Sequence, residues 1–172
     1  LHPDPVFLER GEGAYVIDID GNRYLDFNNN FTALMHGHAH PAIVKAVADQ
    51  ALRGVSFGSP TLHEAQMAEH LAARIPGIEQ VRFQNTGTEA VLVAIKAARA
   101  YTGRSMIAKL EGAYHGFYDF AEVSQELGLL SSGPAEEPAS LSPSYGTPAD
   151  VARQVLVLPM NDEAAARALI NR

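Results

Sequence analysis

Short apolar runs bounded by turn residues predict the strands of this chain. Residues 14–19 and 23–27 flank Asp20-Gly21-Asn22, and an Asp-Gly pair between two such runs is a strong hairpin signal. The polar stretch Asn28–Phe31 that follows favours a loop. Three later apolar runs, at residues 80–84, 105–110 and 155–158, predict further strands. The strand at 105–110 is expected to be buried.

Apolar residues at helical spacing predict helices between these strands, and capping residues set their ends. Pro41 suits the first position of a helix, where its missing N–H costs nothing. Thr61 and Glu64 form a capping-box pattern ahead of another helix. The expected helices run from Pro41 to Gly54, from Thr61 to about Ile75, from the residues after Asn85 to about Tyr101, and onward from Asp162.

Strands that alternate with helices predict an α/β fold with a mostly parallel sheet. The helix that ends near Tyr101 carries an apolar stripe broad enough to bury against that sheet, formed by Ala90, Val91, Ala94, Ile95 and Ala98. Residues 125–150 are rich in serine, proline and glycine and have neither period, so we interpret them as a long loop or flap. The chain stops at Arg172 inside or just after a helix, which indicates a cut rather than a domain boundary.

Composition narrows the classes of partner. A hydrophobic fraction of 47% in 172 residues is typical of a globular domain. A formal charge of −7, with no basic run, argues against nucleic acid or an anionic membrane as a partner. The chain has no cysteine, no apolar stretch of transmembrane length and no signal-peptide pattern at its start, so we expect a soluble, cytoplasmic protein.

The segment Asn85–Ala90 lies between an apolar run and a helical pattern, and it is named here the phosphate cradle. A strand that turns through glycine into a helix points unpaired N–H groups at one spot, where the helix dipole favours an anion. Thr86 and Thr88 add hydroxyl donors, and Gly87 lets an anion approach the backbone. The alternative is a plain capping box, with Thr86 at the N-cap and Glu89 three residues on. The local pattern leaves both interpretations open.

Several motifs, in order along nearly the whole chain, resemble those of one enzyme family. They are Gly13-Ala14-Tyr15, Asp18-Ile19-Asp20-Gly21, Tyr24-Leu25-Asp26, Gly37-His38-Ala39-His40-Pro41, Ser56–Thr61, the phosphate cradle, Glu111–Gly116 and Pro159–Asp162. On these residues the chain resembles the amino-terminal part of class III pyridoxal-phosphate aminotransferases, most closely the branch that contains glutamate-1-semialdehyde aminomutase. The resemblance implies fold type I, with residues 1–60 as the amino-terminal segment of the small domain and a linker. Residues 61–172 would then be the first, incomplete part of the large cofactor-binding domain.

The resemblance also implies roles in binding pyridoxal 5'-phosphate. Thr86, Gly87 and Thr88 match the turn that holds the cofactor phosphate, and we expect the backbone N–H groups of Gly87 and Thr88 to contribute more than Thr86. Tyr114 matches the aromatic residue that stacks on the pyridine ring, since a flat aromatic face orients a flat ring. His115 has a supporting role beside it. Without the resemblance, Tyr114 would be interpreted as an ordinary core or rim tyrosine.

Phe31 matches an aromatic residue that lines the substrate pocket in the aminomutase branch, and binding residues concentrate on loops. The alternative, a phenylalanine that anchors its loop to the core, stays open. The family's Schiff-base lysine belongs to a downstream segment, and the lysines of this chain, Lys45, Lys96 and Lys109, do not match its position. We therefore expect no catalytic residue in this chain.

The family's activity implies transfer of an amino group from an amino acid or amine donor to a carbonyl acceptor, by a homodimer whose loops, such as Ser56–Thr61, contribute to the site. The aminomutase reaction is the alternative. Residues Val123–Gly128 stand where the aminomutases carry a small-residue gating motif, and this departure favours a transaminase. A protein that truly ended at Arg172 would instead be a non-catalytic phosphate-binding module.

Three other patterns in the sequence carry little weight. The segment Gly54-Val55-Ser56-Phe57-Gly58 has the spacing of a nucleophile elbow, but no strand is expected before the serine. His36, His38 and His40 alternate as zinc ligands on a strand can, but no carboxylate is evident to orient them, so we expect no metal site. Gly11-Glu12-Gly13 leads into a strand rather than a helix, unlike a dinucleotide fingerprint.

Overall fold

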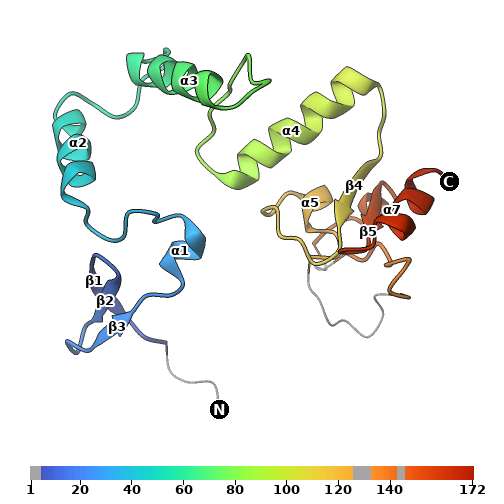
Figure 1. Cartoon of the computed structure of the whole chain (residues 1–172), viewed down its shortest axis with the longest axis horizontal. Helices are drawn as coiled ribbons and strands as arrows, with labels where there is room; N and C mark the ends of the chain where they lie inside the picture. The colour runs from blue at the N-terminus through green and yellow to red at the C-terminus, as the bar shows by residue number, and fades with distance from the viewer. Residues whose placement is uncertain (1–4, 126–132, 143–145) are drawn as a thin grey trace. The chain divides into compact units, whose positions relative to one another are not determined.

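The computed structural model describes residues 5–125, 133–142 and 146–172. The chain divides into two compact units, Leu1–Met67 and Ala68–Arg172, and each contains its own small sheet (Figure 1). Much of the expected flap at 125–150, and residues 126–128 of the segment compared with the gating motif, lie outside the described residues. The assignment of residues 1–60 and 61–172 to a small and a large domain stays a prediction.

The first unit contains an antiparallel sheet whose strands lie in the order β1 (Leu8–Glu12), β2 (Tyr15–Asp18) and β3 (Arg23–Leu25). The expected hairpin is confirmed, and β1 is a strand that the sequence pattern missed. The Asp18 carboxylate accepts hydrogen bonds from the N–H groups of Asp20 (3.0 Å) and Asn22 (2.8 Å) and from the Tyr24 hydroxyl (2.8 Å). A further bond from the Asn22 side chain is the largest of the effects that lower the pKa of Asp18, and together these bonds fix the turn.

Three helical segments follow the hairpin. The first, α1 (Asn29–Thr32), corrects the expected loop, because its backbone is helical but left-handed, with φ of 49°, 48°, 53° and 70° along the four residues. Asparagine tolerates this conformation better than most residues, which explains how a polar stretch can form it. The next two helices, α2 (Pro41–Ala51) and α3 (Leu62–Arg74), confirm the predicted ones, and the Thr61 N–H donates to the Glu64 carboxylate at 2.8 Å, as a capping box requires.

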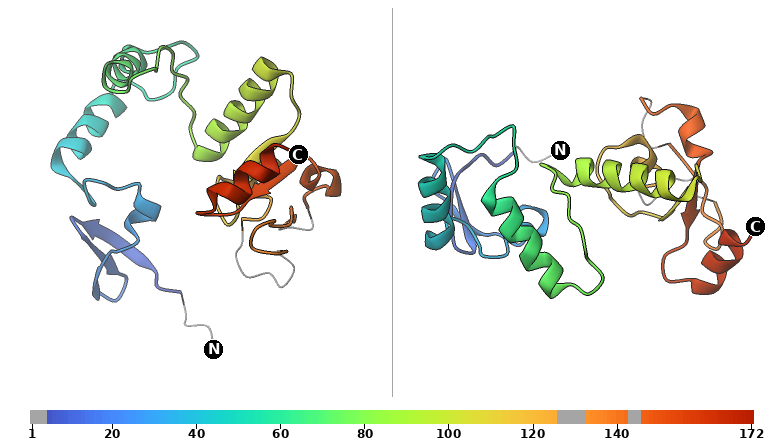
Figure 2. Two further views of the ribbon diagram at one scale, coloured as in Figure 1. Left: turned by 45° about the vertical axis from the view of Figure 1, so that its right-hand side comes forward. Right: turned by 90° about the horizontal axis from the view of Figure 1, so that it is seen from above.

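The second unit places α4 (Gly87–Thr102) beside a parallel pair of strands, β4 (Ile107–Leu110) and β5 (Val155–Leu158) (Figures 1 and 2). The left-handed Gly103 ends α4, and α7 (Glu163–Ile170) begins after Asp162, whose side chain caps it. These elements confirm the α/β fold with parallel pairing in this unit. Two single-turn helices, α5 (Asp119–Glu122) and α6 (Ala149–Ala152), were not predicted.

The core of the second unit is small and consists of valines. Val123, Val151, Val155 and Val157 are buried together, and the partly buried Ile107 and Phe120 pack against them. No residue of α4 is buried, and its apolar stripe instead lines an open groove beside β4. The expected burial of this stripe is therefore wrong for this chain, because β4 and β5 are the only strands that the described part of this unit contains, too few to cover the helix face.

Two strand predictions in the second unit need correction. Residues 80–84 form neither strand nor helix, and none of the described strands pairs with them, so their backbone has no ladder of hydrogen bonds. The strand within 105–110 is present, but only Lys109 of β4 is buried, and Leu110 is exposed. The apolar run at 105–110 therefore predicted a strand correctly. The run at 80–84 did not, because no described strand pairs with it. Among the described residues, every helix is too short or too polar to span a bilayer.

Candidate functional site

The phosphate cradle forms the start of α4, and its capping box is confirmed. Thr86 is extended (φ −137°, ψ 159°), and its hydroxyl oxygen accepts the N–H of Glu89 at 3.1 Å. In return, the Glu89 carboxylate accepts the N–H groups of Asn85 (2.8 Å) and Thr86 (3.2 Å). The capping box therefore occupies the donors on the N-terminal side of the cradle and the acceptor oxygen of the Thr86 side chain.

The two backbone donors that remain belong to Gly87 and Thr88, the first residues of the helix. In the described part of the chain, neither N–H has a hydrogen-bond acceptor, as is usual for the first turn of a helix. A Cβ built on Gly87 would meet no atom within 4 Å, so the space over this backbone is open. Two free N–H groups, an open approach and the positive end of a helix dipole suit a phosphate group.

The aromatic turn, Tyr114-His115-Gly116, is held against this helix start. The Thr88 hydroxyl oxygen accepts the N–H of Phe117 at 3.2 Å. Gly116 has a φ of +88°, and a Cβ there would lie 2.4 Å from Thr88 Oγ1 and 2.8 Å from Thr88 Cα. The structure thus brings the two strongest motifs of the sequence into direct contact through Thr88, and only glycine permits this approach.

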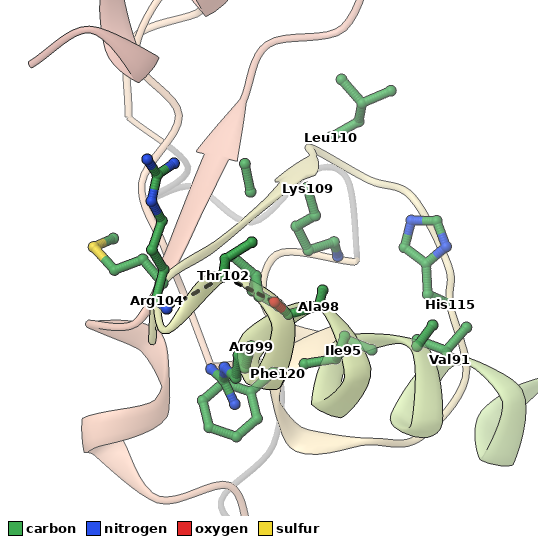
Figure 3. Close-up of a pocket in the computed structure, with 15 residues that line it drawn as sticks. Val91, Ile95, Ala98, Arg99, Thr102, Arg104, Lys109, Leu110, His115 and Phe120 are labelled. Carbon is green, nitrogen blue, oxygen red and sulfur yellow. Dashed lines mark hydrogen bonds between the residues drawn. The ribbon is translucent and has the colours of Figure 1, made fainter.

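Tyr114 and His115 are both exposed among the described residues. The Tyr114 side chain is 61% exposed and meets the Phe117 ring edge-on, with 5.8 Å between ring centroids. Tyr114 is therefore not buried among the described residues, and its role in stacking on the cofactor ring stays a prediction. His115 lines the groove between α4 and β4, where Figure 3 shows it near Val91 and across from Lys109.

Lys109 lines the same groove as His115 and ties β4 to the segment that follows α5. Its ammonium donates to the carbonyl of Val123 at 2.5 Å, and the N–H of Gly112 donates to the next carbonyl, Ser124, at 2.8 Å. Burial lowers the pKa of the Lys109 ammonium, because desolvation disfavours its charged form. The sequence analysis gave Lys109 no role, although a lysine inside an apolar strand is itself a signal of a buried amine.

Phe31 belongs to the first unit and lies in α1. Its side chain is 84% exposed within the described residues, and both interpretations, a pocket-lining ring and a loop anchor, stay predictions. The nearby Asp26 carboxylate lies 2.7 Å from Nε2 of His38. The sequence analysis found no carboxylate for the histidines of this region, and Asp26 is the one that it missed.

The alternating histidines do not gather around a common point. The rings of His36 and His40 meet edge-on, with centroids 5.6 Å apart, while His38 pairs with Asp26. Among the described residues, no group of three or more histidine or acidic side chains is arranged to hold a metal ion.

Comparison with known proteins agrees with this geometry. A family model described as aminotransferase class-III matches residues 2–126. Glutamate-1-semialdehyde 2,1-aminomutase from Chloroflexus aurantiacus is 46% identical over 165 residues, which cover 96% of this chain and 36% of that protein. An omega-transaminase from Sphaerobacter thermophilus has a TM-score of 0.91 and 51% identity, over 99% of this chain and 39% of that one. A transaminase with pyridoxal phosphate bound has a TM-score of 0.87 and 42% identity, over 100% of this chain and 39% of that one.

Fold and site together define a pyridoxal-phosphate-dependent protein of fold type I. The chain belongs to the class III aminotransferase family. It spans between 36% and 39% of the length of these relatives. Pyridoxal 5'-phosphate is the cofactor, and the free N–H groups of Gly87 and Thr88 and the exposed ring of Tyr114 fit its phosphate and its pyridine ring.

Proposed function

We propose that the complete protein catalyses transamination between an amino acid or amine donor and a carbonyl acceptor, and that this chain supplies the phosphate- and ring-binding part of the site. One observation carries the proposal, namely the contact that Thr88 makes with Gly116 and Phe117. This contact holds the turn that carries the exposed Tyr114 against the first turn of α4, to which the free N–H groups of the cradle belong. A phosphate and an aromatic ring on one small ligand would need both features at once.

Each residue of the site has a distinct task in this proposal. The N–H groups of Gly87 and Thr88 hold the phosphate, while Thr86 mainly caps the helix and offers its hydroxyl proton. Tyr114 packs one face of the pyridine ring, and His115 supports the turn. Bound pyridoxal phosphate supplies the electron sink for amino-group transfer, and the protein orients it. Phe31 lines the substrate pocket.

A glutamate-1-semialdehyde aminomutase is the second candidate, and the 46% identity to such an enzyme favours it. Against it stands the segment that begins at Val123. The Ser124 hydroxyl donates to the carbonyl of Ala139 at 2.8 Å and accepts the N–H of Leu141 at 2.9 Å, and Ser124 itself has a φ of +50°. The sequence of this segment departs from the small-residue motif that the resemblance implies for the aminomutases, and this departure favours the transaminase.

The reaction type is tested by assaying the complete protein with pyridoxal phosphate. A panel of amines with a keto-acid acceptor should give time-dependent amino transfer, whereas glutamate-1-semialdehyde alone should not be isomerised at a comparable rate. Efficient isomerisation without amino transfer to the acceptor would replace the transaminase by the aminomutase. A protein that neither binds pyridoxal phosphate nor transfers an amino group would contradict the proposed function.

Replacement of Tyr114 by alanine is expected to weaken cofactor binding about tenfold, because the ring loses one packed face while the phosphate contacts remain. Tyr114→Phe keeps the aromatic face and is expected to bind pyridoxal phosphate nearly as well as the parent protein. Titration of the apoprotein, followed by the visible absorption of the bound cofactor, measures both. Equal affinity of Tyr114→Ala and the parent protein would remove Tyr114 from the site.

We further infer that the Schiff-base lysine is none of the three lysines described above and belongs to a downstream segment. Lys109 is buried and bonded to Val123, and Lys45 pairs with Asp49 on an exposed helix face. Borohydride reduction of the holoprotein followed by peptide mapping should place the label outside residues 1–172. A label on Lys45, Lys96 or Lys109 would contradict the assignment. The family also supports a homodimer, and we propose a cytoplasmic location.

A further inference from the structure

The backbone of α1 is strained and needs support from outside. All four residues from Asn29 to Thr32 have positive φ, a conformation that opposes the Cβ of any residue except glycine. Asparagine tolerates it, but Phe31 and the β-branched Thr32 do not tolerate it well. Consecutive residues in such a conformation persist only where neighbouring groups fix them, and strain of this kind concentrates at functional sites.

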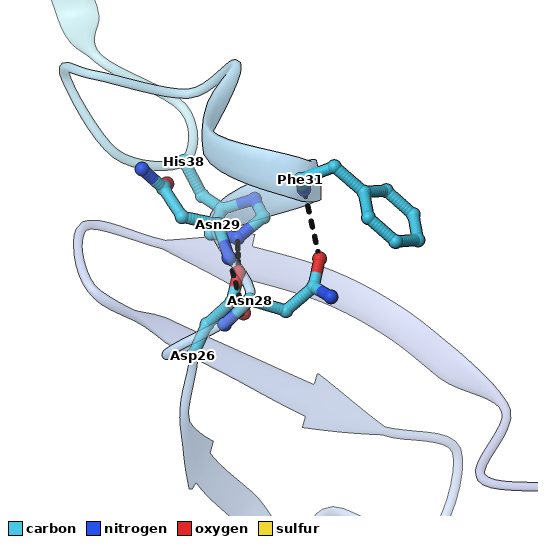
Figure 4. Close-up of polar contacts among 5 residues, drawn as sticks. All are labelled: Asp26, Asn28, Asn29, Phe31 and His38. Carbon is cyan, nitrogen blue, oxygen red and sulfur yellow. Dashed lines mark hydrogen bonds and ion pairs between the residues drawn. The ribbon is translucent and has the colours of Figure 1, made fainter. Parts of the chain in front are cut away.

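One oxygen of the Asp26 carboxylate provides part of this support. Its Oδ1 accepts the N–H groups of Asn28 (3.0 Å) and Asn29 (2.8 Å) at the start of the turn (Figure 4). The Asn28 side chain continues the support, because its Oδ1 accepts the N–H of Phe31 at 2.9 Å. A short chain of hydrogen bonds therefore runs from Asp26 to the backbone of Phe31.

The other oxygen of Asp26 is held by His38, which is itself fixed in place. Asp26 Oδ2 lies 2.7 Å from His38 Nε2, and this bond is the largest effect that lowers the pKa of Asp26. The His38 backbone exchanges two hydrogen bonds with Gly13, of 3.0 Å and 2.8 Å. Its ring lies directly on Gly11, where a Cβ would come within 2.4 Å of the ring. His38 thus ties the carboxylate to the hairpin.

Within the described residues, the apolar ring on this turn has little cover. The Phe31 ring is 84% exposed, and Figure 4 shows it pointing away from the Asp26 cluster. Covering exposed apolar surface with another apolar group lowers the free energy of the system. A ring that is both exposed and held on a rigid turn is suited to contact the apolar part of a ligand, since no ordering of the turn is needed on binding.

We propose that Asp26 and His38 are positioning residues that fix the direction of the Phe31 ring, and that the ring thereby selects amine donors with an apolar side chain. The inference rests on the proposed transaminase function and assigns its substrate class. In the part of the chain that the structure describes, Asp26 and His38 make no hydrogen bond to Phe31 itself. The bonds of Asp26 end on the N–H groups of Asn28 and Asn29 and on His38, and they reach Phe31 through the Asn28 side chain.

The test is a double-mutant cycle in the complete holoenzyme, with kcat/KM measured for an apolar amine donor and for a small polar one. Phe31→Ala and Asp26→Ala are each expected to lower the preference for the apolar donor about tenfold, mainly through KM. In the Phe31→Ala background, Asp26→Ala is expected to change the preference no further, because the ring that it positions is absent. Asp26→Asn retains the Oδ1 acceptor and is expected to restore part of the preference.

Asp18→Ala is the matched control, since Asp18 is a carboxylate of the same sheet that organises a different turn with hydrogen bonds of similar length. It is expected to lower stability without changing donor preference. If Asp26→Ala kept the normal preference for the apolar donor while Phe31→Ala lowered it, the inference would be overturned and the proposed function would stand. An unchanged preference in Phe31→Ala would remove Phe31 from the pocket and overturn it as well. A failure to transaminate any donor would overturn the proposed function and the inference together.

Discussion

The Gly116→Ala variant is expected to lose both stability and cofactor affinity. The new methyl group would lie 2.4 Å from Thr88 Oγ1 and 2.8 Å from Thr88 Cα, and the second contact is with backbone that cannot rotate away. The positive φ of +88° adds its own cost of about 1–2 kcal/mol for any residue with a Cβ. With the cost of overpacking, the free energy of unfolding should fall by roughly 2–5 kcal/mol. Pyridoxal phosphate should bind more than tenfold more weakly, because the aromatic turn moves off the helix.

Gly77→Ala is the matched control for this variant. Gly77 lies in the same unit with a φ of +87°, and a Cβ there would meet no atom within 4 Å. It should therefore show the backbone cost alone, about 1–2 kcal/mol, and bind the cofactor normally. Thermal unfolding of the apoprotein and cofactor titration give the two readouts. Equal losses in the two variants would mean that the contact between Gly116 and Thr88 contributes nothing.

The Gly87→Ala variant is expected to separate cofactor binding from stability. Gly87 has an ordinary helical φ and open space around it, so alanine is accommodated and improves helix propensity by up to about 1 kcal/mol. The same methyl group would stand in the path of a phosphate that approaches the N–H groups of Gly87 and Thr88. Loss of one charge-assisted hydrogen bond, at about 1.5–3 kcal/mol, corresponds to roughly a 10–100-fold weaker affinity for pyridoxal phosphate.

Pyridoxal without its phosphate is the matched ligand for this variant. Its binding should change little in Gly87→Ala, because only the phosphate approaches the helix start. Fluorescence titration of the apoprotein with both ligands, beside thermal unfolding, measures the three quantities. An unchanged affinity for pyridoxal phosphate in a stable Gly87→Ala protein would show that the anion binds elsewhere.

The parts of this protein that follow from local chemistry could be predicted from the sequence. The Asp20-Gly21 turn, the capping boxes at Thr61 and Thr86, and the end of α4 at Gly103 each depend on residues within one turn of one another. The cradle was predictable for the same reason. Its interpretation as capping box or anion site was not. The structure confirms the capping box and leaves the N–H groups of Gly87 and Thr88 without an acceptor among the described residues, and the anion site stays a prediction.

Features that depend on distant partners were missed or mistaken. Residues 80–84 have a strand-like composition but no described strand pairs with them, so composition alone misassigned them. The left-handed α1 was taken for a loop, because its conformation is imposed by Asp26 and by the histidine that holds it. Lys109 was given no role, since its partner at Val123 is reached only by the fold.

By itself, then, the sequence determined the order of the motifs, the family they indicate, the cofactor and the helix start that suits its phosphate. Only the tertiary structure decided that Thr88 joins this helix start to the aromatic turn, and that Asp26 pairs with His38. The physical reason is range. Caps and turns are satisfied by neighbours along the chain. The packing of Gly116 on Thr88 and the pairing of Asp26 with His38 exist only once distant segments meet.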